Sequence, residues 1–266
     1  MKLKLFQVDA FTNQLFGGNP AAVCPLDDWL PDEQMQQIAA ENNLAETAFY
    51  VPQGDQFGLR WFTPAVEVDL CGHATLATAM VLFNVFQHAE PELRFTTRSG
   101  VLTVKQEGQR MVMDFPSDTL SPAELPSALQ TGLGLSAPPV ATFRGGSDLL
   151  VVLDSPSQVA DLQPDFRTLK EEGSYRGLIV TAPGDEVDFV SRFFAPAAGI
   201  DEDPVTGSAH TTLTPYWAQR LGKDTLVAQQ LSSRGGIIYC THQGDRTLIA
   251  GNAVLYLRGE IDLPTA

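Results

Sequence analysis

Short apolar segments separated by turn residues recur along the chain, and most have the alternating or β-branched character of strands. The first residues, Met1 to Asp9, alternate in this way, and later segments repeat the pattern. These later segments are Leu59–Phe62, Val101–Val104, Met111–Phe115, Leu149–Leu153, Gly177–Val180, Phe189–Phe194 and Ala253–Leu257. We therefore expect β-sheet to dominate the scaffold.

Two segments have helical patterns of different kinds. Pro31 to Asn42 places apolar residues on one face and begins with proline, which predicts an amphipathic helix on the outside of the fold. Ala74 to Phe86 is apolar nearly all round, which predicts a helix buried inside a curved sheet. After Gly207 a second central helix is harder to place, because Pro215 would remove a backbone hydrogen bond and kink or end it.

The chain repeats itself about half its length apart. The paired blocks are Arg60–Ala65 and Arg192–Ala197, Gly72–Thr75 and Gly207–His210, Phe95–Val101 and Leu231–Ile237, and Gly108–Arg110 and Gly244–Arg246. They keep one order in a chain of 266 residues, with spacings of 132 to 136. We predict an α+β fold of two homologous domains related by a pseudo-twofold axis, with a cleft between them as the place for a pocket. The domains are residues 1–117 and 118–252, and the C-terminal strand 253–266 is a candidate addition to the first.

Composition narrows the function classes. The net charge is −15, and the 17 lysines and arginines form no basic patch, which disfavours nucleic acid and anionic membranes as partners. Neither a membrane-spanning apolar run nor a signal-peptide core is found, so we expect a soluble, cytoplasmic protein. The three cysteines lack CxxC spacing, and His88, His210 and His242 lack metal-ligand spacing, which argues against disulfide or zinc sites.

A glycine-led turn precedes each central helical segment, as Cys71–Ala74 in the first half and Thr206–Ala209 in the second. The start of a helix presents unpaired N–H groups, so the backbone at Gly72 and Gly207 could hold a carboxylate or an oxyanion in an acidic protein. The simpler interpretation is that glycine only permits a tight turn. Because both halves carry the turn, we favour a small carboxylic acid as ligand.

Two acidic residues have no counterpart in the other half. Glu46 lies in an apolar, strand-like run, where desolvation would raise its pKa toward the range useful for general acid and base catalysis. A solvent-facing strand glutamate is the alternative. Asp203 lies in a three-residue insertion before the second glycine turn, where it could cap a helix that starts at the following proline. The functional alternative places Asp203 in the cleft near His73 and Ser208.

Six segments carry a resemblance to a known family. They are Val8–Phe11, Gly18–Val23, Glu46–Phe49, Phe62–Pro64, Cys71–Thr75 and Asp203–Ala209. In these segments, and in their order, the chain resembles the phenazine-biosynthesis (PhzF-like) isomerase family. The resemblance implies the diaminopimelate-epimerase-like fold, in which two similar domains each wrap a barrel-like sheet around a central helix. It also implies a homodimer, no cofactor and no metal.

The resemblance also implies roles for individual residues. The acid matching Glu46 moves a proton between carbons of a cyclic dihydro-hydroxyanthranilate, first as general base and then as general acid. Residues matching His73, Asp203 and Ser208 line the substrate, and backbone amides near Gly72–His73 and Gly207–Ser208 bind its carboxylate. The substrate itself does not carry over, because one fold serves several reactions. We predict an isomerase of a small, cyclic carboxylic acid.

Two alternative functions remain at this point. Racemases of the same superfamily place a cysteine in each half, but here Cys71 is matched by Thr206. A single-thiol epimerase or dehydratase is therefore one alternative, with the pKa of Cys71 lowered by its place at a helix start. The other is a dimeric small-acid-binding protein without turnover. Glu46 disfavours it, because a pure binder gains nothing from a carboxylate that faces an anionic ligand.

Overall fold

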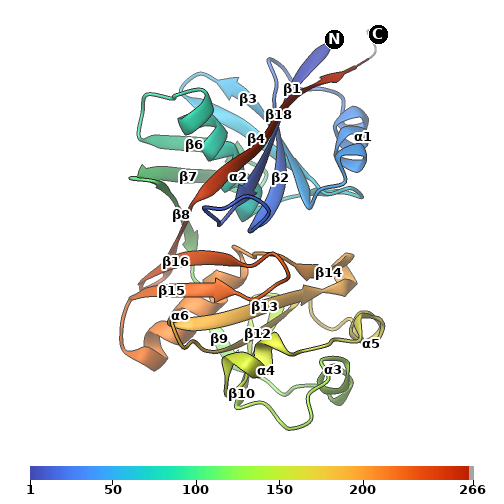
Figure 1. Cartoon of the computed structure of the whole chain (residues 1–266), viewed down its shortest axis with the longest axis vertical. Helices are drawn as coiled ribbons and strands as arrows, with labels where there is room; N and C mark the ends of the chain where they lie inside the picture. The colour runs from blue at the N-terminus through green and yellow to red at the C-terminus, as the bar shows by residue number, and fades with distance from the viewer. Residues whose placement is uncertain (264–266) are drawn as a thin grey trace. The chain divides into compact units, whose positions relative to one another are not determined.

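The computed structural model describes residues 1–263, which form two compact units (Figure 1). One unit is Met1–Asp114 together with the described residues from Ala250 onward, and the other is Phe115–Ile249. The sequence-based boundary was placed at residue 117. Residues 264–266 of the predicted C-terminal strand lie outside the described residues.

Nine strands form the sheet of the first unit. They are β1 (Lys2–Ala10), β2 (Asn19–Pro25), β3 (Glu46–Gln53), β4 (Gln56–Phe62), β5 (Glu67–Val68), β6 (Glu92–Thr97), β7 (Gly100–Glu107), β8 (Arg110–Pro116) and β18 (Ala253–Asp262). The order runs β18-β1-β2-β3-β4-β6-β7-β8, and β5 also pairs with β4. The pairs β2–β3 and β4–β6 are parallel, while the others are antiparallel.

The helices of the first unit match the two predicted patterns. Helix α1 (Asp32–Asn42) buries Met35, Ile38 and Ala39 in a core cluster shared with β3 and β4, as expected of an amphipathic helix. Helix α2 (Gly72–Met80) is buried from His73 to its end and contacts β1, β2 and β3. It continues as a π-helical turn, η1 (Val81–Val85). The predicted buried helix is confirmed, but it begins at Gly72 and its last turn is π-helical.

The second unit repeats this arrangement with its own nine strands. They are β9 (Leu120–Pro122), β10 (Ala141–Gly145), β11 (Asp148–Val152), β12 (Leu178–Pro183), β13 (Phe189–Ala195), β14 (Ile200–Asp203), β15 (Thr225–Gln230), β16 (Gly236–Gln243) and β17 (Arg246–Gly251). The order is β9-β10-β11-β12-β13-β15-β16-β17, with β14 also on β13. The pairs β11–β12 and β13–β15 are parallel, as are their counterparts in the first unit. The predicted internal repeat is thereby confirmed.

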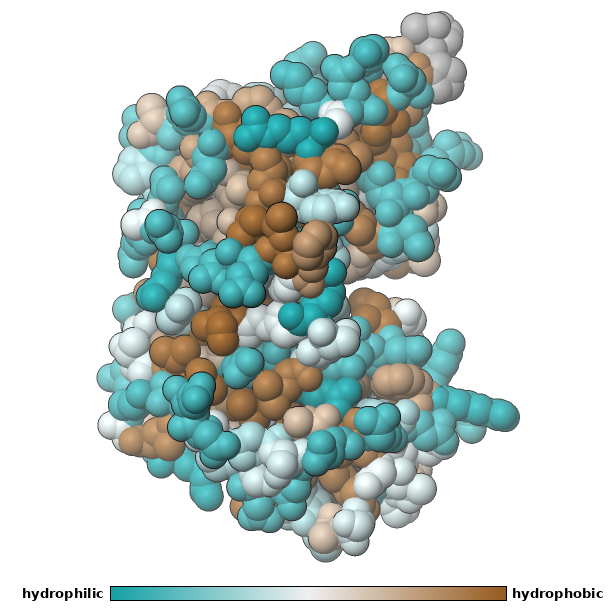
Figure 2. Space-filling model, viewed as in Figure 1, coloured by the Kyte–Doolittle hydropathy of each residue, from teal (hydrophilic) through white to brown (hydrophobic). Residues whose placement is uncertain are grey.

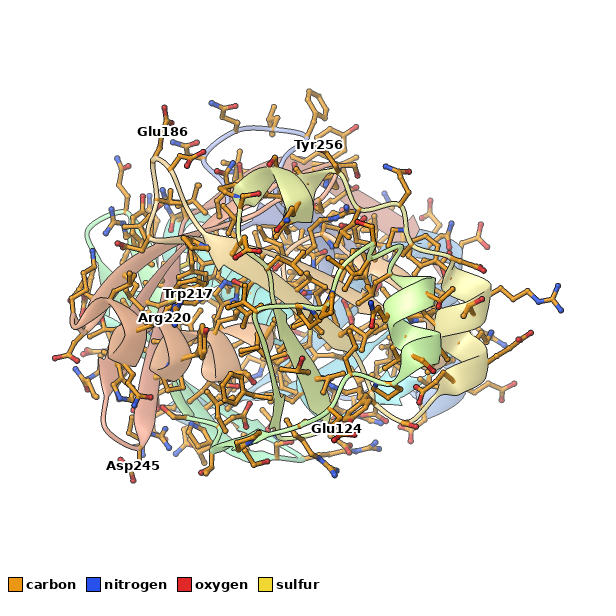
Figure 3. All side chains as sticks on the ribbon, turned by 90° about the horizontal axis from the view of Figure 1, so that it is seen from below. Glu124, Glu186, Trp217, Arg220, Asp245 and Tyr256 are labelled. Carbon is orange, nitrogen blue, oxygen red and sulfur yellow. The ribbon has the colours of Figure 1, made fainter. Side chains whose placement is uncertain are left out.

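Short helices flank this second sheet, and a long one lies within the unit. The short ones are α3 (Ser127–Gly132), α4 (Pro156–Ala160), α5 (Phe166–Glu172) and η2 (Pro196–Ala198). The long one, α6 (Ala209–Leu221), contacts β11, β15 and β16. Its Trp217 is 1% exposed and stacks on Phe189, and Figure 3 places it in the interior, with Glu186 and Asp245 at the periphery. Helix α6 is therefore the central helix of this unit.

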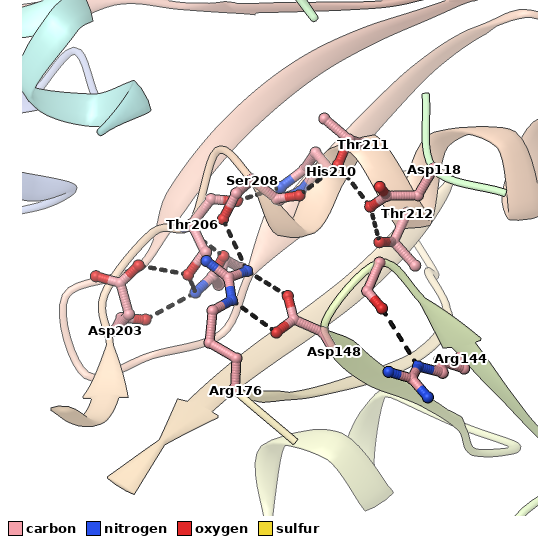
Figure 4. Close-up of polar contacts among 12 residues, drawn as sticks. Asp118, Arg144, Asp148, Arg176, Asp203, Thr206, Ser208, His210, Thr211 and Thr212 are labelled. Carbon is pink, nitrogen blue, oxygen red and sulfur yellow. Dashed lines mark hydrogen bonds and ion pairs between the residues drawn. The ribbon is translucent and has the colours of Figure 1, made fainter. Parts of the chain in front are cut away.

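The expectation that Pro215 would end this helix was wrong, because α6 continues for six residues beyond it to Leu221. Proline lacks the N–H that would bond the carbonyl of Thr211 four residues earlier. The backbone N–H of Asp118 takes that place, at 3.1 Å from the Thr211 oxygen. The carboxylate of Asp118 also accepts hydrogen bonds from the hydroxyls of Thr211 and Thr212, at 2.9 and 2.6 Å (Figure 4). A segment distant in sequence thus compensates for the lost hydrogen bond.

Apolar side chains also reach the surface of the first unit. Phe16 is 69% exposed, and its ring lies 5.8 Å from that of Tyr256 on β18. Leu15 and Leu257 are exposed as well. Figure 2 shows apolar side chains gathered on the visible face of this unit. Within residues 1–263, no helix has the length and apolar character needed to cross a membrane.

Candidate functional site

The first unit brings two predicted site residues into contact. Glu46 is the first residue of β3, and His73 is the second residue of α2. Oε2 of Glu46 lies 3.0 Å from Nε2 of His73, and the residues are 8% and 5% exposed. Neither of these two atoms has another partner among the described residues. The alternative of a solvent-facing Glu46 is therefore wrong, and the expected desolvation of this residue is confirmed.

Two further polar side chains approach the other ring nitrogen of His73. Nδ2 of Asn19 lies 3.2 Å from Nδ1, and Sγ of Cys71 lies 3.6 Å from it. Asn19 is the first residue of β2, which pairs in parallel with β3, so the two strand starts converge on the start of α2. Sequence reasoning did not identify Asn19 as a site residue. Its only signal was its place in one of the segments that resemble the family.

The charges of Glu46, Cys71 and His73 follow from their burial and from their contacts with one another. Burial alone lowers the pKa of His73, but the interactions with Cys71 and Glu46 outweigh it, and the pKa lies well above its ordinary value of 6.5. Burial, followed by the charge of Glu46, raises the pKa of Cys71. A thiol with a raised pKa is uncharged near neutral pH, so the carboxylate of Glu46 is the anion that stabilises the imidazolium. The expectation that the helix start would lower the pKa of Cys71 was wrong, because desolvation is the larger effect.

The same three side chains, Glu46, Cys71 and His73, are a possible metal-ligand set. One ligand atom from each lies within 4.8 Å of the others, and carboxylate, thiolate and imidazole suit Zn²⁺. In this structure, however, the carboxylate and the thiol approach opposite nitrogens of the imidazole. That geometry fits a chain of polar contacts through His73 better than a chelate.

The second unit positions Asp203 by side-chain contacts of its own. Asp203 ends β14, and its Oδ2 accepts a hydrogen bond of 2.5 Å from the hydroxyl of Thr206. Gln230 on β15 donates to the Asp203 carbonyl at 2.7 Å and accepts from the Thr206 N–H at 2.9 Å (Figure 4). Helix α6 begins only at Ala209, with Ser208 as its N-cap. The interpretation of Asp203 as a helix cap was therefore wrong.

Ser208 lies beside an arginine that sequence reasoning missed. Nη2 of Arg176 donates to Oγ of Ser208 at 3.3 Å, and Nε of the same guanidinium donates to Oδ1 of Asp148 at 2.8 Å (Figure 4). Arg176 lies two residues before β12 and is not part of any of the repeated blocks, so the sequence offered no signal for it. His210, the second residue of α6, donates from Nδ1 to the carbonyl of Thr206 at 2.8 Å, with burial lowering its pKa to about 4.

Both glycine turns leave backbone donors available. In the first unit the earliest helical bond of α2 runs from Thr75 to the carbonyl of Cys71 at 3.1 Å, so the N–H groups of Gly72 and His73 precede it. In the second unit the N–H of His210 bonds the carbonyl of Gly207 at 3.0 Å. Among the backbone hydrogen bonds of the described turns, loops and caps, none starts from the N–H of Gly72, His73, Gly207 or Ser208. Each turn therefore retains the donors that a carboxylate would need.

Comparisons with known proteins identify the family of the chain. A family model described as phenazine biosynthesis-like protein matches residues 8–259. A Pseudomonas aeruginosa protein named an uncharacterized isomerase is 53% identical over 263 residues, covering 99% of this chain and all of that protein. The crystal structure of a phenazine biosynthesis protein of the PhzF family from Enterococcus faecalis has a TM-score of 0.95 at 48% identity, covering 99% of this chain and all of that one.

More distant structures share the fold alone. A hydroxyproline epimerase from Agrobacterium vitis aligns with a TM-score of 0.62 at 10% identity, over 98% of this chain and 92% of that one. The predicted family resemblance and the predicted epimerase-like fold are confirmed by these matches. The prediction of an isomerase rather than a binding protein is likewise confirmed by the close relatives.

Proposed function

We propose that this chain catalyses a proton transfer within a small carboxylic acid. The chain belongs to the phenazine biosynthesis-like protein family and is an isomerase-type enzyme. In this proposal Glu46 is the general base and then the general acid. The observation that carries it is the buried contact of Glu46 with His73, at 3.0 Å, beside the free backbone donors of the first glycine turn. A carboxylate held in a desolvated position next to an anion-binding turn has the arrangement needed for this chemistry.

The reaction conserves both atoms and electrons. The carboxylate of Glu46 takes a proton from a carbon of the substrate, and the electron pair of that C–H bond delocalises into the conjugated system next to the substrate carboxylate. The carboxylic acid of Glu46 then returns the proton to another carbon. Because no electrons leave the substrate, the proposed reaction does not call for a redox cofactor.

His73 supports Glu46 in two ways under this proposal. Its positive charge lies beside the carboxylate that accepts the proton. When Glu46 has taken the proton, the same imidazolium can stabilise the negative charge that develops on the substrate. Asp203, Ser208 and the backbone at Gly207 are proposed to contact the substrate from the second unit. Their joint position with Glu46 in one cleft stays a prediction.

A single-thiol mechanism with Cys71 is the second candidate. Its support is the 3.6 Å contact between Sγ of Cys71 and the ring of His73, which could act as its base. The raised pKa of Cys71 disfavours it, because the thiolate is the reactive form. The place of a second thiol in the other half is taken by Thr206, which excludes the two-cysteine arrangement.

We also propose a homodimer in the cytoplasm, with no nucleic-acid or membrane partner. The exposed apolar side chains around Phe16 and Tyr256 support a protein partner, since such groups favour interfaces. Sedimentation of the protein tests this, and Phe16→Asp should shift a dimer toward monomers. A wild-type protein that sediments as a monomer at micromolar concentration would contradict the proposal.

The test of the reaction is NMR of a panel of small carboxylic acids, including hydroxyanthranilates and cyclic amino acids, in D2O. Wild type is compared with Glu46→Gln, and with Glu92→Gln as a control that removes an exposed carboxylate on β6. We expect one or more acids to take up carbon-bound deuterium with wild type and the control. The uptake should disappear in Glu46→Gln while binding persists. Binding without exchange by wild type, or exchange that survives Glu46→Gln, would refute it.

A further inference from the structure

The guanidinium of Arg176 links three elements of the second unit. Asp148, at the start of β11, accepts hydrogen bonds from Nε and Nη2 of Arg176 and is itself 3% exposed. Nη2 also donates to Oγ of Ser208, the N-cap of α6. The guanidinium carbon lies 5.6 Å from the ring centroid of Phe193 on β13. Arg176 is thereby held in place while its side chain stays 45% exposed, so it is accessible to a ligand at Ser208 (Figure 4).

The position of Arg176 corresponds closely to that of Glu46 in the first unit. Phe49 pairs with Arg60 in one sheet, and Val180 pairs with the matching Arg192 in the other. Glu46 lies three residues before Phe49, so its counterpart is Gly177, three residues before Val180. Gly177 directly follows Arg176. Thus one unit places a carboxylate beside its glycine turn, and the other places a guanidinium beside the equivalent turn. The scaffold repeats, but the guanidinium beside the second turn is paired with the buried carboxylate of Asp148.

The charges around Arg176 show what it contributes. Asp148, Asp118 and Asp203 all interact electrostatically with its guanidinium. Without that positive charge, an anionic group arriving at Ser208 would face a cluster of carboxylates in a protein of net charge −15. In addition, Oγ of Ser208 accepts a hydrogen bond from Arg176, which leaves the serine O–H free to donate to a ligand oxygen.

We propose that Arg176 is a specificity-determining residue that makes the Ser208 end of the site select a negatively charged group, the carboxylate of the substrate. It offsets the charge of Asp148, to which it is hydrogen-bonded, and orients the Ser208 hydroxyl as a donor. The inference rests on the proposed function, since it assumes that Ser208 contacts the substrate. Under this inference, Arg176 is the residue that makes the protein bind a carboxylate more tightly than a neutral analogue.

The experiment compares two probes that differ at one group, the carboxylate of anthranilate and the neutral carboxamide of anthranilamide. Their dissociation constants are measured by NMR titration for wild type, Arg176→Gln and Arg176→Lys. Arg144→Gln is the matched control, because it removes an exposed arginine of the same unit whose described hydrogen bond is to the Gly146 carbonyl. Thermal unfolding of each variant is recorded alongside. Lysine keeps the charge but cannot bridge Asp148 and Ser208 with one planar group, so it separates charge from orientation.

We expect Arg176→Gln to weaken anthranilate binding by about tenfold, because a charge-assisted hydrogen bond is lost, and to leave anthranilamide binding within about twofold. Arg176→Lys should fall between it and wild type, and Arg144→Gln should match wild type. Equal weakening of both probes, or no change in either, would overturn the role of Arg176 even if the Glu46-dependent exchange is observed. If Arg176→Gln does not fold, an Arg176→Lys variant with unchanged selectivity and unchanged probe affinities would overturn it. A wild type that binds no acid and exchanges no proton would instead refute the proposed function.

Discussion

Replacing Glu46 by Gln should release the proton that His73 holds in the folded protein. Glutamine keeps the size of the side chain but removes the negative charge 3.0 Å from Nε2 of the imidazole. Two unit charges at that separation interact by about 5 kcal/mol at an effective dielectric constant of about 20, an upper limit from which desolvation subtracts. Each pKa unit corresponds to about 1.4 kcal/mol. We therefore expect the pKa of His73 to fall, by up to about 3.5 units, because burial is then opposed by the interactions with Cys71 alone.

The assay is an NMR titration of the imidazole Cε1–H signals, of which this chain has only four. His73→Gln identifies the signal of His73 by its disappearance, and Glu92→Gln controls for the loss of a carboxylate elsewhere in the first unit. Stability supplies an independent check. The folded pKa of His73 is raised above its unfolded value, so the pair stabilises the protein fully below pH 6.5 and less as the pH rises through the folded pKa. The loss of stability in Glu46→Gln should therefore be larger at pH 6 than at pH 9. A His73 that titrates in Glu46→Gln as it does in wild type would refute this reasoning.

Three other predictions concern the buried groups around the site. Burial lowers the pKa of His210 from 6.5 to about 4. The protein should therefore lose about 3 kcal/mol of folding stability as the pH falls from 6.5 to 4, because the unfolded chain binds a proton there and the folded one does not. Urea unfolding of wild type and His210→Asn at both pH values measures this loss. An equal pH dependence in the two proteins would contradict this. Cys71 should react slowly with iodoacetamide at pH 8 in the native protein, as followed by mass spectrometry, because burial raises its pKa; labelling as fast as in the unfolded chain would be the opposite result. Leu76→Ala should lower the free energy of unfolding by about 2 to 5 kcal/mol, since Leu76 is fully buried in α2. Leu15→Ala, at an exposed position, should cost less than about 0.5 kcal/mol, and equal losses in the two variants would argue against a central α2.

The sequence predicts most of the fold, because the hydrophobic pattern is strong. The all-round apolar segment after Gly72 could only be a buried helix, and the repeated blocks required two similar sheets. Pro215 was misjudged, because its compensation comes from the backbone of Asp118, far away in sequence. Local rules describe what proline removes from a helix, but they do not show which distant N–H group replaces the lost donor.

The candidate site was predictable only in part for a similar reason. Glu46 was found because it has no acidic counterpart in the second half. His73 was found because it lies in a segment that resembles the family. Asn19 and Arg176 were missed, because each acts through contacts between separate strands and a helix start. The pKa of Cys71 was predicted in the wrong direction, since its position at a helix start is visible in the sequence and its burial is not. Contacts between distant segments determine these properties.

The central claim is that one carboxylate, Glu46, removes a proton from the substrate and returns it to the same molecule. The most direct test uses an acid identified by the exchange screen, labelled with deuterium at the reacting carbon and converted by wild type in H2O within a single turnover. Because Glu46 is only 8% exposed, we expect part of the label to reappear at the second carbon of the product, as detected by deuterium NMR. Complete replacement of the label by solvent hydrogen, with equal conversion by Glu46→Gln, would contradict the account.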